Sequence, residues 1–380
     1  MHTLIAQTPK KGRTRPVKRN SSARWLRGLT AAAAVALFLL GGRQLTPAFD
    51  WLLGRAVLFT TMLDMPTGAL ETLRDRYADT LAEEPDPAPE EPQEPPAPQE
   101  PIPEGPVEIP EVPEEYRGTI SELTMTGDSS PAYCRWGDAY IRNYTGLTNA
   151  QIETVLETPC KVRLNRKSSQ PQVLLFHTHA TESFEPYDSE FFDTRNNWRD
   201  DDNTNNMVAV GDVLASGLEA CGVAVLHDDT QHDNPTYTGA YLRSTEMIKN
   251  YQAEYRDLRI LLDIHRDGIV YSDTSIAKTT AMVEGKKAAQ LMIIAPYDDG
   301  TLNVPKWREN FRFAVELTDR INSVYPNLMR PVFFCSRSYN YACSDGALLL
   351  EFGTNGNTLE EAQYTAALIA PIIAAVLQGE

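Results

Sequence analysis

The sequence predicts an α/β domain with a mostly parallel sheet flanked by helices, preceded by a membrane segment and a disordered linker. Three observations lead to this prediction. Short apolar runs alternate with amphipathic helical patterns in the part of the chain after residue 117. A basic stretch followed by an apolar stretch stands near the N-terminus. A run rich in proline and glutamate separates that stretch from the alternating part.

The first residues indicate membrane targeting. Residues 1–27 hold eight Lys or Arg and no acid, and we expect them to form a cytoplasmic tail. Fifteen uncharged residues, Gly28 to Gly42, precede Arg43. This span is short for a membrane helix, which needs about 20 residues, and it is at the upper limit for a signal-peptide core. Because no small-x-small cleavage site follows, we interpret 28–43 as an uncleaved transmembrane signal anchor. A cleaved signal peptide would leave the rest of the chain in the same extracytoplasmic compartment.

Two segments of different character follow the apolar stretch. Residues 44–82 have apolar side chains at helical spacing, broken by Pro66 and Gly68, which predicts an amphipathic helical juxtamembrane region or a small helical hairpin. Residues 83–116 hold twelve acids and no base, with a proline every two or three residues. Such a composition cannot build a core, so we expect a disordered, extended linker.

The charge of the chain is concentrated in that linker. Its twelve acids account for most of the seventeen excess negative charges of the whole sequence, so the global acidity says little about the globular part. The globular sequence shows no basic patch of the kind that binds nucleic acid, and we expect no nucleic-acid partner.

The remaining sequence predicts the folded part. Residues 117–170 are expected to form a small leading region with one helix at "TNAQIETVLET", capped by Thr148 or Asn149. Residues 171–380 are expected to form the main α/β domain. The expected strands are "KVRLN", "QVLLFH", "GVAVLHD", "RILLDIH", "AAQLMIIA", "PVFFCS" and "ALLLEFG". The expected helices cover residues 205–220, 239–254, 305–323 and 358–378. Five cysteines without CxxC spacing do not indicate a disulfide framework, although one bridge remains compatible with an extracytoplasmic domain.

Three of the predicted strands end in polar residues that carry chemistry. "VLLF" runs into His177, Thr178 and His179, "RILLDI" runs into His265, and "GALLL" runs into Glu351. In an open parallel sheet the functional groups gather beyond the carboxyl ends of the strands, so these three ends are expected to lie within reach of one another.

The spacing of these residues predicts a metal site. His179 and Glu182 stand three residues apart, which places both on one face of a turn, and His265 would complete a His₂Glu set. His177 is the alternative to His179. Zn²⁺ held by such a set, with a fourth position open, is a hydrolytic arrangement in which the metal activates water and polarises a carbonyl. Glu351 is the expected catalytic proton acceptor, with a pKa raised by partial burial.

Four further residues are expected near the site. Asp267 or Asp263 would orient a ligand imidazole through its second nitrogen. Arg266 would hold a substrate carboxylate in a fork, or it would form only a local ion pair with Asp267. His232, like His227, either binds substrate or caps a loop with neighbouring aspartates. Taken singly, each of these residues also has an ordinary structural explanation.

Four segments, in chain order, also resemble one known family. They are "QVLLFHTHATESF", "GVAVLHDDTQHDNPTYTGAYLRS", "ILLDIHRDG" and "SYNYACSDGALLLEFGTNGNTLEEA", and they fall between residues 172 and 362. The chain resembles the stage II sporulation protein P family of peptidoglycan hydrolases from endospore-forming bacteria. In two places, "LEFGTN" and "HATES", the sequence departs from the residues usual in that family. Neither change removes a charged or ligand-type residue.

The resemblance implies more than the spacing does. It implies a fold similar to zinc-dependent N-acetylmuramoyl-L-alanine amidases, cleavage of the amide between muramic acid and L-alanine, and cleavage of the cross-link between stem peptides. It implies action between mother cell and forespore during engulfment, with a lytic transglycosylase and membrane proteins of the engulfment complex as partners. It also assigns the metal ligands to His179 (or His177), Glu182 and His265, and the proton shuttle to Glu351.

The function expected from the sequence is therefore that of a membrane-anchored zinc peptidoglycan amidase and endopeptidase. Two alternatives stay open at this point. One is a wall-binding scaffold that keeps the fold but has lost the chemistry. The other is a different extracytoplasmic zinc hydrolase, such as a carboxypeptidase-like enzyme that acts on free peptides.

Overall fold

The structure is a computed structural model that describes residues 111–380. The predicted cytoplasmic tail, signal anchor and juxtamembrane helices lie outside the described residues, as does the linker up to residue 110. Of the linker, only its last residues are described, and they include the short 3₁₀ helix η1 (Glu114–Tyr116).

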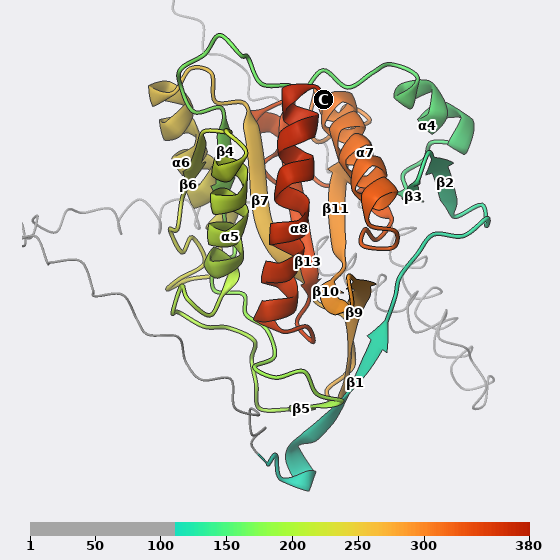
Figure 1. Ribbon diagram of the computed structural model, residues 1–380, viewed down its shortest axis with the longest axis vertical. Coiled ribbons are helices and arrows are strands. Elements are labelled where there is room, and N and C mark those ends of the chain that lie inside the picture. The colour runs from blue at the N-terminus through green and yellow to red at the C-terminus, as the bar shows by residue number, and fades with distance from the viewer. Residues whose placement is uncertain (1–110) are drawn as a thin grey trace, which may run out of the picture. The chain divides into compact units, whose positions relative to one another are not determined.

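An eight-stranded sheet forms the centre of the described part (Figure 1). Its strands, in sheet order, are β2 (Tyr133–Trp136), β3 (Ala139–Tyr144), β12 (Val332–Cys335), β11 (Leu291–Pro296), β13 (Gly346–Thr354), β7 (Ile260–Asp267), β4 (Val173–Phe176) and β6 (Val225–His227). The pairs β2–β3 and β11–β13 are antiparallel, and the other pairs are parallel. The α/β class is as predicted, and the sheet is mixed with parallel pairs in the majority.

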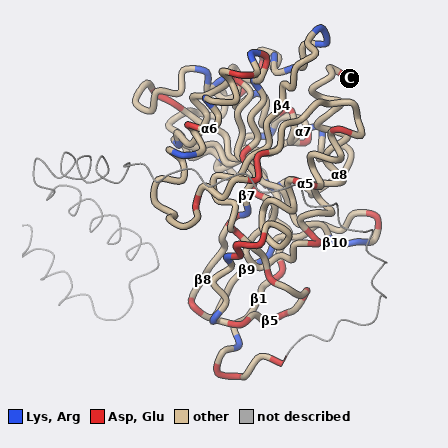
Figure 2. The backbone as a smooth tube through the Cα atoms, turned by 90° about the vertical axis from the view of Figure 1, so that its left-hand side faces the viewer, with Lys and Arg blue, Asp and Glu red and all other residues tan. Residues whose placement is uncertain are grey.

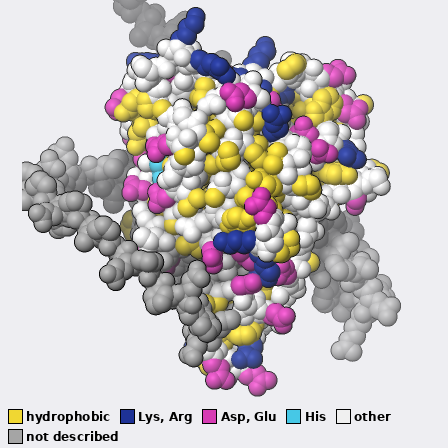
Figure 3. Space-filling model, in the orientation of Figure 1, with side chains coloured by type: hydrophobic (Ala, Val, Ile, Leu, Met, Phe, Trp, Pro, Cys, Tyr) yellow, Lys and Arg dark blue, Asp and Glu magenta, His cyan; other side chains and the backbone are white. Residues whose placement is uncertain are grey.

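Three helices cover one face of this sheet. They are α5 (Met207–Ala220), α8 (Leu359–Gln378) and α7 (Trp307–Val324), which lie side by side in Figure 1. Every residue of β4 and β13 is buried, which explains why these strands are continuous apolar runs and not alternating ones. On this face charged and apolar side chains are mixed and very little histidine is visible (Figure 3).

The helices begin where side-chain caps satisfy their first N–H groups. Thr358 caps α8 and Thr148 caps α4 (Asn149–Leu156), and both form a capping box with the third helical residue. Asn206 caps α5 by accepting from the N–H of Val208. Among the described helices, α8 alone is long and apolar enough to cross a membrane, but it is mostly buried against the fold, as a core helix is.

The opposite face of the sheet is covered less completely. Helix α6 (Ala240–Glu254) lies on that side, whereas α5, α7 and α8 lie on the other, as the edge-on view of Figure 2 shows. The 3₁₀ helix η2 (Tyr341–Cys343) contacts α6. We call this less covered side of the eight-stranded sheet the open face.

A second, smaller sheet lies at the lower end of Figure 2. It consists of β10 (Lys286–Ala289), β9 (Ser275–Val283), β1 (Arg117–Leu123) and β5 (Phe191–Asp193), with β8 (Val270–Ser272) paired to β9. Lys278 of β9 is buried, and its ammonium lies 3.1 Å from Glu361 at the start of α8. This ion pair connects the small sheet to the helical layer.

The structure corrects two of the predicted strands. "KVRLN" is not a strand, because the N–H of Leu164 donates to the carbonyl of Leu377 at the end of α8 and finds no strand partner. "AAQLMIIA" is divided between β10 and β11 at Gln290, whose N–H donates to Thr279 of the small sheet. The residues expected as a leading region also contribute β2 and β3 to the eight-stranded sheet, within the same compact unit.

Candidate metal centre and active site

The three strands with polar ends are direct neighbours. Strand β7 pairs in parallel with β13 on one side and with β4 on the other. The Cα atoms of His265 and Glu351 are partners in the β7–β13 register, so their side chains leave the sheet on the same face. The predicted convergence of three strand ends is therefore present, and it occurs on the open face.

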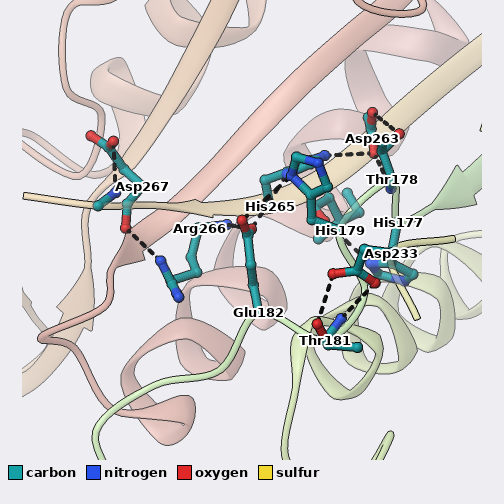
Figure 4. A network of polar contacts seen from close by, with 12 residues as sticks. His177, Thr178, His179, Thr181, Glu182, Asp233, Asp263, His265, Arg266 and Asp267 are labelled. Carbon is teal, nitrogen blue, oxygen red and sulfur yellow. Dashed lines mark hydrogen bonds and ion pairs between the residues drawn. The ribbon is translucent and has the colours of Figure 1, made fainter. Parts of the chain in front are cut away.

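His179, Glu182 and His265 form a buried cluster. One ligand-type atom from each lies within 4.8 Å of the other two. The Nδ1 atoms of His179 and His265 lie 3.5 Å and 3.4 Å from the two carboxylate oxygens of Glu182. Figure 4 shows the Glu182 carboxylate directed toward His265. Two imidazoles and one carboxylate at this spacing fit the donor set that Zn²⁺ prefers.

The pKa values of Glu182 and His265 result from burial and from hydrogen-bonded neighbours that act in the opposite direction. Burial disfavours the charged form of Glu182, but hydrogen bonds with His179 and His265 outweigh it and hold its pKa well below 4.5. Burial also acts to lower the pKa of His265, but Asp263 and Glu182 outweigh it and raise that pKa well above 6.5. Without a metal, His265 is therefore a proton-carrying bridge between two carboxylates, and metal binding must release that proton.

Asp263 is the residue that orients His265. Its Oδ1 accepts from His265 Nε2 at 2.9 Å, on the ring side away from Glu182. Thr178 holds the Asp263 carboxylate through its backbone N–H at 2.9 Å and its hydroxyl at 2.7 Å. A carboxylate bonded to the second nitrogen of a ligand imidazole is the usual outer support of a zinc site. Asp267, the alternative, pairs instead with Arg330 at 2.8 Å.

His177, the alternative to His179, lies outside the cluster. Its Nε2 lies 2.8 Å from Nε2 of His227 and its Nδ1 lies 3.2 Å from the carbonyl of Ile264. Burial and the neighbouring His227 lower its pKa to about 3. Both ring nitrogens are engaged by residues of β6 and β7, and Gly211 of α5 leaves room for the two imidazole rings. Side chains two residues apart are separated here because the strand ends and the chain turns at Thr178.

Glu351 is a buried carboxylate beside the cluster. Burial raises its pKa, the charge of Asp267 adds to this, and the result is a pKa of about 8. Its Oε2 is buried and has no hydrogen-bond partner among residues 111–380. A protonatable oxygen with no partner, next to a metal-type donor set, is available to a reacting molecule.

Two residues predicted to bind substrate have other contacts. The guanidinium of Arg266 donates to the backbone carbonyls of Ser183 at 2.7 Å and Trp198 at 3.0 Å, so two of its nitrogens are bonded to the loop after the cluster, and a fork to a substrate carboxylate stays a prediction. It also makes no ion pair with the Asp267 carboxylate, which Arg330 holds. His232 is buried, and its Nε2 lies 3.8 Å from Asp228 without a hydrogen-bond partner among residues 111–380, so both interpretations of this residue stay predictions.

Sequence reasoning did not identify the aromatic and cationic rim of the cluster. Tyr237 stacks on His179 with ring centroids 4.5 Å apart, and Tyr241 meets the same ring edge-on at 5.4 Å. Arg199 lies 3.7 Å from the Glu182 carboxylate and 2.6 Å from Asp233, and its guanidinium lies over Tyr237. These residues come from loops and from α6, where no periodic pattern marks them.

Comparisons with known proteins show which family the chain resembles. Residues 118–374 match the family model described as stage II sporulation protein P (SpoIIP). Stage II sporulation protein P of Bacillus subtilis (strain 168) is 29% identical over 214 residues, which cover 53% of this chain and 49% of that protein. The chain thus spans about half the length of the curated relative that it matches.

Solved structures give weaker matches. N-acetylmuramoyl-L-alanine amidase AmiC2 of Nostoc punctiforme has a TM-score of 0.34 at 14% identity, covering 56% of this chain and 97% of that one. The N-acetylmuramoyl-L-alanine amidase of Clostridium difficile 630 has a TM-score of 0.32 at 13% identity, covering 55% and 94%. At such TM-scores these matches carry no conclusion about the site. The family match does not depend on them, and its 257-residue span covers the polar ends of all three strands. The chain belongs to the stage II sporulation protein P family.

Proposed function

We propose that this protein is a zinc-dependent peptidoglycan hydrolase of endospore formation, which cleaves the amide between muramic acid and L-alanine and the cross-link between stem peptides. The observation that carries the proposal is the His179–Glu182–His265 cluster, whose ligand-type atoms lie within 4.8 Å of one another, with Glu351 in register beside His265. Membership of the stage II sporulation protein P family supports the substrate class and the biological setting.

Each residue has a distinct role in this proposal. His179, Glu182 and His265 would hold Zn²⁺, which when bound activates water and polarises the scissile carbonyl. Asp263 keeps the proton of His265 on Nε2, so that Nδ1 presents its lone pair toward Glu182 and the metal position. Glu351 accepts a proton from the attacking water and delivers it to the leaving amine nitrogen, which completes the hydrolysis. Its raised pKa suits a group that must both accept and return a proton near neutral pH.

The proposal includes the predicted location. The basic N-terminal segment would stay in the cytoplasm, the apolar segment would anchor the chain, and the linker would carry the hydrolase domain into the space between mother cell and forespore. A lytic transglycosylase and membrane proteins of the engulfment complex are the proposed partners, as the family resemblance implies.

Digestion of purified cell-wall sacculi tests the proposed activity. The full-length chain with Zn²⁺ is expected to release stem peptides, and a chelator is expected to stop the release. Glu351→Gln keeps the size of the side chain and removes the proton acceptor, so the rate is expected to fall about 10²- to 10⁴-fold. Glu316→Gln, at a half-buried acid that pairs with Arg163, is the matched control and should keep the wild-type rate.

The same assay separates the alternatives. A wall-binding scaffold would bind sacculi, release nothing, and be indifferent to Glu351→Gln. A carboxypeptidase-like enzyme would degrade soluble peptides faster than sacculi and would leave the muramoyl amide intact. Release of stem peptides at full rate by Glu351→Gln would contradict the proposed role of this residue.

A further inference from the structure

A cavity of about 390 Å³ lies on the open face at β11 and β12. Met292 and Ile294 of β11, Phe333 of β12 and Arg142 of β3 line it, together with Asp267 and Arg330. Its volume lies within the range of small-molecule sites. None of its lining residues belongs to the His179–Glu182–His265 cluster.

The strand register places one wall of this cavity next to the candidate active site. Met292 is the Cα partner of Glu351, which is the partner of His265, so the three side chains form one row across β11, β13 and β7. Directly paired residues leave a sheet on the same face. A substrate held at His265 and Glu351 therefore has Met292 as its next neighbour along the row.

A second row extends the cavity toward the edge of the sheet. Ile294 pairs with Phe333, Phe333 with Arg142, and Arg142 with Tyr133. Residues Ile294 and Met292 are two apart on β11 and share a face. The alternating residues Ile293, Phe334, Ile141 and Cys134 are almost fully buried on the helix-covered face. The open face thus presents an apolar floor edged by charged groups.

Arg330 is the group on which the inference depends. Its side chain is only 7% exposed, and its Nη2 lies 2.8 Å from Asp267. Its Nη1 is buried without a hydrogen-bond partner among residues 111–380. An unpaired donor of a buried cation is costly, and a second acceptor would remove that cost. The cavity is lined by two cations, Arg330 and Arg142, and one anion, Asp267, so the charge around the apolar floor is net positive.

We propose that this cavity is a subsite of the hydrolase in which Arg330 binds a carboxylate of the peptide stem while Met292, Ile294 and Phe333 contact its apolar side chains. The proposal rests on the proposed function for its substrate class. A guanidinium with a free donor matches a carboxylate, and the apolar floor matches the small methyl-bearing side chains of a stem peptide. It moves the carboxylate contact expected of Arg266 to a different residue.

Strand spacing gives the distance from the candidate active site to the apolar floor. Strands β7 and β11 are separated by β13, so His265 and Met292 are about 10 Å apart across two spacings of 4.7–4.9 Å. An extended peptide covers about 3.3–3.6 Å per residue. A side chain of the stem that contacts Met292 therefore belongs to about the third residue from the scissile bond, about 10 Å away.

Binding measurements on a chain that does not turn over test the subsite. The full-length Glu351→Gln chain, loaded with Zn²⁺, is titrated by calorimetry with a muramoyl tripeptide that has free carboxylates and with its fully amidated counterpart. The acid is expected to bind about 10- to 100-fold more tightly than the amide, the range typical of a charge-assisted hydrogen bond. Adding Arg330→Gln is expected to reduce this ratio to about one. Adding Arg312→Gln, at a half-buried arginine paired with Glu309 on α7, is the matched control and should leave the ratio unchanged.

A second variant keeps the test decisive if Arg330→Gln does not fold. Thr126 is exposed and lines the cavity, so Thr126→Glu adds a negative charge without disturbing the core, and the ratio should fall severalfold. Equal binding of acid and amide by the parent chain overturns the subsite, as does a ratio unchanged by the folded Arg330→Gln or Thr126→Glu chain. Failure of the wild-type chain to digest sacculi, with the acid preference present, would instead reject the hydrolysis and leave the subsite in place.

Discussion

Replacement of Glu351 by Gln is expected to stabilise the metal-free protein at pH 8. In the fold, burial and the charge of Asp267 raise the pKa of Glu351 from 4.5 to about 8. The folded state therefore keeps a proton that the unfolded state loses between these two pH values. Stability of the wild type falls as pH rises through this window, because the carboxyl binds its proton more tightly in the folded state.

The size of the effect follows from the two pKa values. Each pH unit over which the folded and unfolded states differ by one bound proton changes the free energy of unfolding by 1.36 kcal/mol. Between pH 5 and pH 8 the difference integrates to about 3.5 kcal/mol. Glutamine has the same shape and does not titrate, so the free energy of unfolding of Glu351→Gln relative to wild type should rise by about 3.5 kcal/mol over this range.

Urea denaturation in the presence of a chelator, at pH 5 and at pH 8, measures this difference. Asp298→Asn is the control. Hydrogen bonds from the N–H groups of Leu302 and Val304 lower the pKa of Asp298 below 3.8, so the free energy of unfolding of this variant relative to wild type should not change between pH 5 and pH 8. Saturating Zn²⁺ should shrink the Glu351 effect, because a cation nearby favours the ionised carboxylate. If the free energy of unfolding of Glu351→Gln relative to wild type is the same at pH 5 and pH 8 without metal, the conclusion that Glu351 is buried and protonated is refuted.

Two further predictions concern the supports of the site. Asp263→Asn should weaken Zn²⁺ binding about 10- to 100-fold. The donors from Thr178 and His265 use both carboxylate oxygens of Asp263, whereas an amide offers one acceptor oxygen, so His265 would lose its orientation. Competition with a chelating dye measures the Zn²⁺ affinity, and an unchanged affinity would contradict the prediction. Gly211→Ala should lower the free energy of unfolding by about 1–3 kcal/mol, because its Cβ would lie 2.5 Å from the His227 ring. The control Gly146→Ala, whose Cβ would meet no atom within 4 Å, should match wild type in the same urea titration.

Much of the fold could be predicted because its patterns are local. Apolar runs of strand length identified β4, β7 and β13. Helical periodicity identified the helices, and for α4 a predicted cap at Thr148 also contributed. The small sheet was missed, since β1 and β9 pair over more than 150 residues of sequence and have no marked alternation.

The candidate ligand cluster could also be predicted, because the polar residues stand at the ends of apolar runs and one physical rule brings parallel strand ends together. That rule held for His179, Glu182 and His265, which share one cluster. It could not separate His179 from His177, since the chain turns between them and the outcome depends on contacts with α5.

Residue patterns were sufficient to predict the α/β class, the apolar strands with polar ends, and the residue types of the candidate site. The folded structure was needed to show which aspartate bonds to His265, what Arg266 contacts, and that buried Arg330 has a donor without a partner among residues 111–380. The physical reason is that periodicity and capping act between residues a few positions apart. Side-chain partners are instead set by strand order, and strand order is fixed by the packing of the whole sheet.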